Sequence, residues 1–109
     1  VAPANVTVDV RLHSAAPPAP VPMQSRAVQC ALRAIETGFH QKPALMRAGG
    51  SIPIVSTFRS LLAVETLLVG FGLPDDRIHS PNEKFDLDAL FNGTRTIAAL
   101  YYELGKGVK

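Results

Sequence analysis

The chain has 109 residues, of which 47% are hydrophobic and 18% charged, so it suits one globular domain and excludes a disordered protein. The formal net charge is only +2, and acidic and basic residues are interspersed, so we expect no nucleic-acid partner. A membrane helix needs about eighteen or more consecutive apolar residues. No such run occurs, and we expect no membrane partner.

The start of the chain, Val1-Ala2-Pro3-Ala4, has no basic segment followed by an apolar one, so we expect no signal peptide. It also lacks an initiator Met, which suits a processed chain or an excised fragment. The single Cys30 cannot form an internal disulfide, and its place on a predicted helix indicates a buried structural thiol rather than a nucleophile. On these grounds we expect a cytoplasmic location.

The first predicted element is a strand over residues 6–13, where apolar and polar residues alternate and one face should be buried. Residues 14–22 follow, rich in Ala and Pro, and read as an extended linker because proline forbids helix and removes ladder donors. Residues 23–37 have helical spacing, with Gly38 as the residue that follows the helix in the left-handed conformation.

A short strand is predicted over residues 43–47, and a helix follows that is capped by Ser51, contains Pro53 in its first turn and ends near Leu62. The apolar run within residues 65–71 predicts a strand buried on both faces. The loop 72–84 and a helix over residues 87–104 complete the order. The alternation of helices and strands predicts an α/β class with mainly parallel strands.

The helical stripes define a predicted core. Its members are the large apolar residues on one side of each helix: Val28, Leu32, Ile35, Ile54, Val55, Phe58, Leu61, Leu62, Leu87, Leu90, Phe91, Ile97, Leu100, Tyr101 and Leu104.

Sites in α/β sheets gather beyond the carboxyl ends of the strands. The first loop in that position holds Gly49, Gly50 and Ser51. The glycines allow close backbone approach, and the N–H groups of the following helix favour an anion such as a substrate carboxylate. The alternative is a tight strand-to-helix turn with a serine cap.

The second loop holds His79, a residue type that commonly binds metals. Glu83, Asp76 or a backbone carbonyl could hold its other ring nitrogen. Asp75 or Asp76 could join it at a metal, but this set is incomplete for a catalytic zinc. The alternative is an exposed loop with a lone histidine. His13 and His40 read as surface residues.

The segments Gly49-Gly50-Ser51-Ile52-Pro53 and His79-Ser80-Pro81-Asn82-Glu83, with an apolar strand between them, resemble the carnosinase-like metallopeptidase family. That family includes aminoacylases, carboxypeptidase G and succinyl-diaminopimelate desuccinylase. The resemblance is greatest to its dipeptidase branch and covers most of the chain, from Val6 to the last helix.

The resemblance implies the C-terminal part of a three-layer zinc-peptidase catalytic domain, which a smaller lid domain interrupts. Residues 1–13 would be the last strand of the lid, 14–22 the proline-rich crossing and 23–109 the C-terminal part of the catalytic domain. Lid domains of this family often dimerise, so a homo-oligomer is expected.

The resemblance also implies the site. His79 would be the last protein ligand of a two-zinc centre, and Gly49, Gly50 and Ser51 would clamp the substrate's carboxylate. Glu83 would support the site without binding the metal. The other ligands and the general base would lie upstream, so no catalytic residue is expected in this chain, which alone should be inactive and metal-free.

The expected substrate is a dipeptide or an N-acyl amino acid. Dipeptidases of the family usually carry an acidic residue before the two glycines, which recognises the free amino group, whereas this chain has Ala48. An amine-blocked substrate therefore becomes more plausible. Two alternatives remain open: a non-catalytic module that oligomerises through the unpaired strand 6–13, and an inactive homologue of the enzymes.

Overall fold

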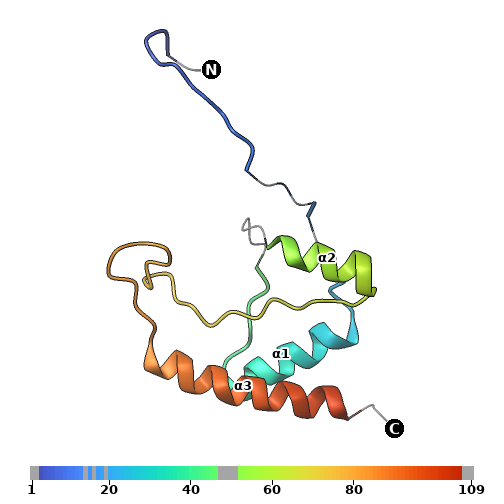
Figure 1. The fold of residues 1–109 in the computed structure, drawn as a ribbon. Coiled ribbons are helices and arrows are strands. Elements are labelled where there is room, and N and C mark those ends of the chain that lie inside the picture. The colour runs from blue at the N-terminus through green and yellow to red at the C-terminus, as the bar shows by residue number, and fades with distance from the viewer. Residues whose placement is uncertain (1–2, 14, 16, 19, 47–51, 107–109) are drawn as a thin grey trace.

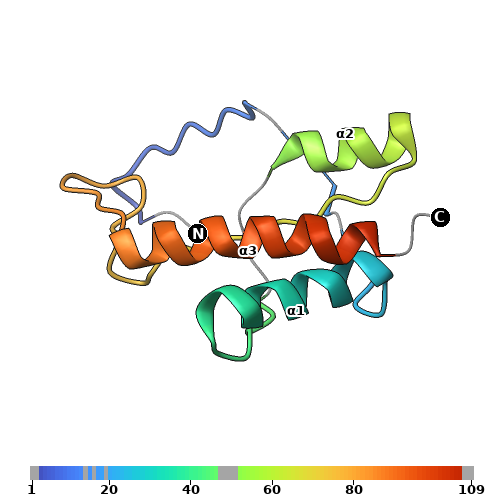
Figure 2. The ribbon, with the colours of Figure 1, turned by 90° about the horizontal axis from the view of Figure 1, so that it is seen from below.

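The computed structural model describes residues 3–13, 15, 17–18, 20–46 and 52–106. These hold three helices: α1 (Arg26–Phe39), α2 (Pro53–Leu62) and α3 (Leu87–Gly105). The helices predicted from the spacing of apolar residues are therefore confirmed, with ends shifted by a few residues. Figures 1 and 2 show α1 and α3 side by side, with α2 apart from the pair.

Helices α1 and α3 form an antiparallel pair that is held together by small side chains. The start of α1 meets the end of α3, where the Arg26 guanidinium donates to the Leu104 carbonyl at 2.8 Å. The buried residues of the two helices are mostly small: Val28, Cys30, Ala31, Ala34 and Gly38 from α1 and Ala89, Gly93 and Thr96 from α3. Short side chains let the two helix backbones approach closely, as Gly38 does against Asn92 and Thr96.

Gly38 was predicted to follow the first helix, and this prediction is wrong. Gly38 lies inside α1 and is buried against α3. A Cβ atom at this position would lie 2.7 Å from the Asn92 carbonyl oxygen and 2.9 Å from the Thr96 nitrogen, both backbone atoms. The helix ends instead at His40, which has a φ of 54° and donates its N–H to the Glu36 carbonyl. Glycine at 38 serves the approach of two helices rather than a turn.

The N-termini of α1 and α3 are set by side-chain caps. Ser25 accepts a hydrogen bond from the N–H of Val28, so α1 begins at Arg26 rather than at Met23 as predicted. Asp86 accepts from the N–H of Asp88 at 2.9 Å and begins α3. Both caps satisfy N–H groups that have no partner within the helix.

Helix α2 packs against the proline-rich segment rather than against another helix. Its Arg59 donates to the Pro20 carbonyl at 3.3 Å. Val55 is buried, and it lines a small pocket together with Pro20, Pro22 and Val64. The N-cap position is occupied by Ile52, whose side chain makes no capping hydrogen bond. The predicted cap, Ser51, lies outside the described residues.

The three segments predicted as strands form no paired ladder within the described part of the chain. Residues 6–13 extend away from the helices (Figure 1), and the valines and leucine expected on a buried face are exposed, with Val10 at 83%. Residues 43–46 and 65–71 are likewise unpaired. The physical reason is that a strand is stable only when its N–H and C=O groups pair with a neighbour. The α/β class depends on those neighbours and stays a prediction.

One residue of the 65–71 segment is anchored. The ring of Phe71 stacks on Phe39 of α1, with centroids 5.7 Å apart and planes 21° apart. A Cβ atom at Gly93 of α3 would lie 2.7 Å from the same ring, so the glycine makes the space that the ring fills. Phe71 thereby joins the segment to both helices of the pair.

The chain exposes far more surface than a complete domain of its size. Its accessible area is 9257 Å², whereas a folded monomer of its mass, 11.7 kDa, exposes about 5,900 Å². The radius of gyration is 18.2 Å, against about 13 Å for a compact chain of this length.

Much of the predicted core is accordingly exposed, and that part of the prediction is wrong for this chain. The exposed members are Ile54, Phe58, Leu61, Leu62, Leu87, Leu90, Phe91, Ile97 and Tyr101. They are the apolar faces that a helix normally covers with a neighbouring layer.

Candidate functional site

The loop that contains His79 is organised around Asp76. This carboxylate is 1% exposed although it lies in a loop. One of its oxygens accepts the backbone N–H of Leu73 at 2.7 Å, and the other accepts the ammonium of Lys84 at 3.0 Å. The backbone N–H of Lys84 also donates to the Asp76 carbonyl at 3.0 Å. Asp76 thus closes the loop on both sides of His79.

Lys84 forms ion pairs with both aspartates of the loop. Its ammonium lies 3.0 Å from Asp76 and 3.1 Å from Asp75. The hydrogen bond from the Leu73 N–H, followed by that from Lys84, lowers the pKa of Asp76. The hydrogen bonds to Asp76 and then to Asp75 raise the pKa of Lys84. Asp76 and Lys84 therefore both carry charge near neutral pH.

His79 lies at the exposed part of this loop, on an unusual backbone. Arg77, His79 and Asn82 have φ values of 55°, 64° and 60°. Left-handed backbone is uncommon for residues other than glycine, although histidine and asparagine adopt it more readily than most. The N–H of Ser80 donates to the Arg77 carbonyl at 2.9 Å and forms the turn that displays His79. The imidazole is exposed to solvent rather than enclosed in the core.

The acids that were expected to assist His79 have other partners. Both oxygens of Asp76 are occupied by Leu73 and Lys84, and Asp75 pairs with Lys84. In the described structure, the carboxylates of Asp76 and Asp75 therefore bond to Leu73 and Lys84 rather than to the His79 ring. Glu83 is exposed and lines a pocket with Gly72, Ile78, Lys84 and Phe85 as well as Asp76.

The other predicted site residues are distributed as follows. Gly49, Gly50 and Ser51 lie outside the described residues, as does Ala48, so the predicted carboxylate clamp stays a prediction. His13 and His40 are exposed, as expected. Cys30 is a buried free thiol, which confirms its predicted burial.

His79 fits the chemistry of a metal site in part. An exposed imidazole on a loop closed by hydrogen bonds can supply one nitrogen ligand. Within the described residues, no group of three His, Cys, Asp or Glu side chains is arranged to hold a metal ion. His79 can therefore contribute to a centre only if donors from outside these residues complete it.

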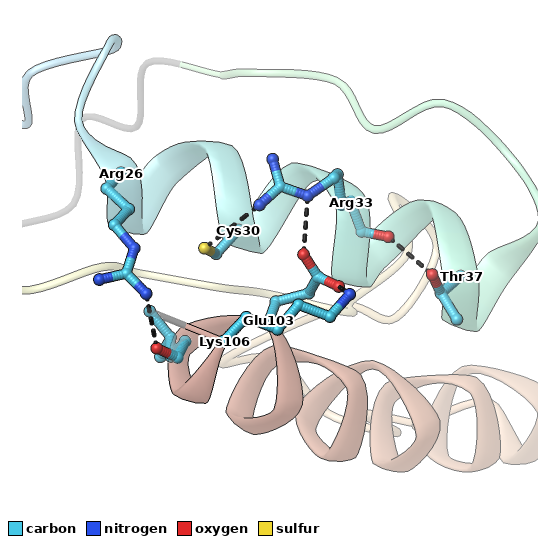
Figure 3. A network of polar contacts seen from close by, with 7 residues as sticks. Arg26, Cys30, Arg33, Thr37, Glu103 and Lys106 are labelled. Carbon is cyan, nitrogen blue, oxygen red and sulfur yellow. Dashed lines mark hydrogen bonds and ion pairs between the residues drawn. The ribbon is translucent and has the colours of Figure 1, made fainter. Parts of the chain in front are cut away.

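A second polar cluster, which the sequence analysis missed, joins the helix pair. Glu103 of α3 lies between two cations: Arg33 of α1 at 2.8 Å and Lys106 (Figure 3). Its pKa is lowered, first by the hydrogen bond from Lys106 and then by that from Arg33. The Arg33 guanidinium also lies 3.4 Å from the Cys30 sulfur. The hydrogen bond from Arg33 to Glu103 fastens α1 to α3.

None of the helices in the described ranges is both long and apolar enough to span a bilayer.

Comparison with known proteins identifies the family. The model of "Peptidase family M20/M25/M40" matches residues 2–103. The Cys-Gly metallodipeptidase DUG1 of Candida albicans is 40% identical over 76 residues, which are 70% of this chain and 16% of that protein. The Beta-Ala-His dipeptidase of Homo sapiens is 36% identical over 76 residues, which are 70% of this chain and 15% of that protein.

A shorter match has higher identity. The Cys-Gly metallodipeptidase DUG1 of Saccharomyces cerevisiae is 46% identical over 57 residues, or 52% of this chain and 12% of that protein. No solved structure matches the chain. The chain spans only about a sixth of the length of the first relatives it matches. The resemblance inferred from the two motifs is confirmed, and the chain belongs to peptidase family M20/M25/M40.

Proposed function

We propose that the complete protein is a metal-dependent hydrolase that cleaves the amide bond of a dipeptide or an N-acyl amino acid. The observation that carries this proposal is the family match over residues 2–103, which includes the loop of His79. The relatives named above as metallodipeptidases support the reaction class. In this proposal the general base comes from outside this chain, so the chain would contribute part of a site and would be inactive alone.

In this proposal His79 binds one metal of a two-zinc centre, and the remaining ligands come from outside this chain. Its exposure and the fixed turn from Arg77 to Ser80 support the role. The metals, when bound, would lower the pKa of a water molecule and polarise the scissile carbonyl. Glu83 supports the loop or a ligand from its exposed position beside the pocket.

Gly49, Gly50 and Ser51 are proposed to bind the substrate's carboxylate. Support comes from the helix that follows them: α2 begins at Pro53, and the side chain of its N-cap residue Ile52 makes no capping hydrogen bond. The N–H groups of its first turn therefore carry the partial positive charge of the helix dipole without a side-chain acceptor at the N-cap. Ala48 favours a substrate whose amine is blocked, such as an N-acyl amino acid.

The fold proposed for the complete domain is α/β with mainly parallel strands. Residues 1–13 would close the lid sheet, 14–22 would cross back, and 23–109 would complete the catalytic layer. The unpaired segments and the exposed apolar faces of α2 and α3 support this arrangement, because they offer surface to further strands and helices. Assembly as a homo-oligomer is part of the proposal. A cytoplasmic location is supported by the unpaired Cys30 thiol.

A second candidate is a non-catalytic module that assembles with copies of itself. The exposure of Val8, Val10 and Leu12 in the unpaired segment favours it, because an extended edge can pair with another chain. Sedimentation of the isolated chain tests this candidate alone, because association is also expected from the exposed apolar faces of the helices. A clean monomer argues against the assembly module.

The test of the main proposal is His79→Ala in the full-length protein. We expect substoichiometric zinc by metal analysis and nearly abolished turnover of a dipeptide or an N-acyl amino acid. His13→Ala is the matched control, since His13 is also exposed and lies on the N-terminal arm. Full zinc and a near-normal rate in His79→Ala would remove the imidazole from the metal centre.

A further inference from the structure

We propose that Asp76 is the positioning residue for His79, and that Lys84 holds Asp76 in this role. The inference rests on the proposed function, in which His79 binds a metal. Asp76 acts through the loop and touches neither metal nor substrate.

The first support is the burial and saturation of the carboxylate. Asp76 is 1% exposed, and each of its oxygens has a partner on a different side of the loop. Leu73 lies before His79 in the chain and Lys84 after it, so one carboxylate ties the two ends of the loop. The backbone bonds from Asp76 to Leu73 at 3.1 Å and from Lys84 to Asp76 at 3.0 Å close the same two ends.

The second support is the backbone inside the closed loop. Arg77, His79 and Asn82 all have positive φ, and none of them is glycine. Backbone of this kind persists where the surroundings over-determine it. The hydrogen bonds of Asp76 are the contacts that bracket these three residues. Loss of the carboxylate should therefore let the loop relax and move the imidazole from its position.

The third support is the contrast with the neighbouring acid. The side chain of Asp75 is 72% exposed, and its contact in the described structure is the ion pair with Lys84. Asp76 has the same ammonium as a partner and in addition accepts a backbone N–H. The two residues carry the same charge at adjacent positions, so they form a matched pair for an experiment.

The experiment compares Asp76→Asn with Asp75→Asn in the full-length protein. Asparagine keeps the shape but has one acceptor oxygen and no negative charge, so either the Leu73 N–H or the Lys84 ammonium faces an NH₂ group that cannot accept it. We expect Asp76→Asn to weaken zinc binding about 10- to 100-fold, measured by competition with a chelator, because a support of a metal ligand is lost. The fall in kcat should exceed any change in KM. Asp75→Asn should match the wild type in both measurements.

Lys84 supplies a second, independent test. Lys84→Met should weaken zinc binding in the same direction as Asp76→Asn, and Lys84→Arg should restore most of the affinity by keeping the cation. Thermal unfolding of each variant is followed in parallel. If Asp76→Asn does not fold, the Lys84 pair decides: wild-type zinc affinity in Lys84→Met would overturn the proposal.

The outcomes distinguish the proposed metal-binding role of His79 from the positioning role of Asp76. Zinc retained in His79→Ala would overturn the proposed function and this inference together. Zinc lost in His79→Ala but held with wild-type affinity in Asp76→Asn would overturn the positioning role alone.

Discussion

The guanidinium of Arg33 on α1 lies 2.8 Å from the carboxylate of Glu103 on α3, and this pair joins two residues that are 70 positions apart in the sequence. Glu103 also receives the ammonium of Lys106 (Figure 3). The carboxylate side chain is only 15% exposed, whereas that of Arg33 is 56% exposed. The acid is therefore the buried member of the cluster, and its removal affects both cations.

The charge on Glu103 should make stability depend on pH. The hydrogen bonds from Lys106 and Arg33 lower its pKa in the folded state, so the unfolded chain binds its proton more tightly. The stabilisation is present above the pKa of this carboxyl in the unfolded chain and is lost as pH falls through the lower folded pKa. Glu103→Gln should reduce the acid sensitivity of the unfolding midpoint, measured by thermal melts of the full-length protein from pH 3 to pH 7. An unchanged pH profile would count against this contribution.

Gly38→Ala should destabilise the helix pair. The new Cβ would lie within 3 Å of the Asn92 and Thr96 backbone atoms, which cannot move without displacing α3. Overpacking of this kind costs roughly 1–3 kcal/mol, measured as the free energy of unfolding in urea. Gly105→Ala is the control, because its Cβ would have no atom within 4 Å. Equal stability of the two variants would show that the helices can separate freely at Gly38.

The carboxylate clamp predicts a particular kinetic change. Ser51→Ala in the full-length protein should raise KM about tenfold or more and leave kcat nearly unchanged, since a hydrogen bond to a charged group contributes roughly 1.5–3 kcal/mol to binding. Steady-state kinetics with an N-acyl amino acid measure both constants. With the same substrate in which the carboxylate is amidated, Ser51→Ala and the wild type should have the same KM. A KM that does not respond to Ser51→Ala would remove this serine from substrate binding.

The 109-residue chain expressed alone should expose apolar surface and self-associate. Phe58, Leu61 and Leu62 of α2 are 38%, 76% and 63% exposed. Contiguous apolar surface of this kind marks a contact site. We expect binding of a hydrophobic dye and concentration-dependent sedimentation, both reduced in Leu61→Glu. Ser60→Glu is the matched control, because Ser60 is an exposed polar neighbour on the same helix. Dye binding equal in the two variants would place the contact surface elsewhere.

The sequence predicted what depends on local spacing. The helices α1, α2 and α3 follow from apolar residues at helical intervals, and the burial of Cys30 follows from its place on α1. The family follows from two short motifs whose residue types are unusual. These properties depend on residues that are close together in the sequence, so they can be predicted without knowing which distant residues are in contact.

Properties that depend on distant residues were not predictable in the same way. Gly38 reads as a helix end by itself, and only the approach of Thr96 shows that it is a contact. From the sequence, Asp76 is one of several possible partners of His79, whereas its burial and its bonds to Leu73 and Lys84 depend on the closed loop. The apolar residues of α2 and α3 gather on one side of each helix as predicted. Their burial, however, also needs a covering layer of other elements.

Phe71 connects the helix pair α1 and α3 with the loop that contains His79. It immediately precedes the loop that Asp76 closes, and Asp86 caps α3 just after that loop. Both ends of the loop are therefore attached to the pair of helices α1 and α3. The first end is held by the Phe71 ring, which packs against Phe39 and Gly93, and the second end continues into the first turn of α3. A shift of α1 against α3 would move both points where the loop is attached to the helices. A substitution far from His79, such as one at Gly38, can therefore alter the position of the imidazole.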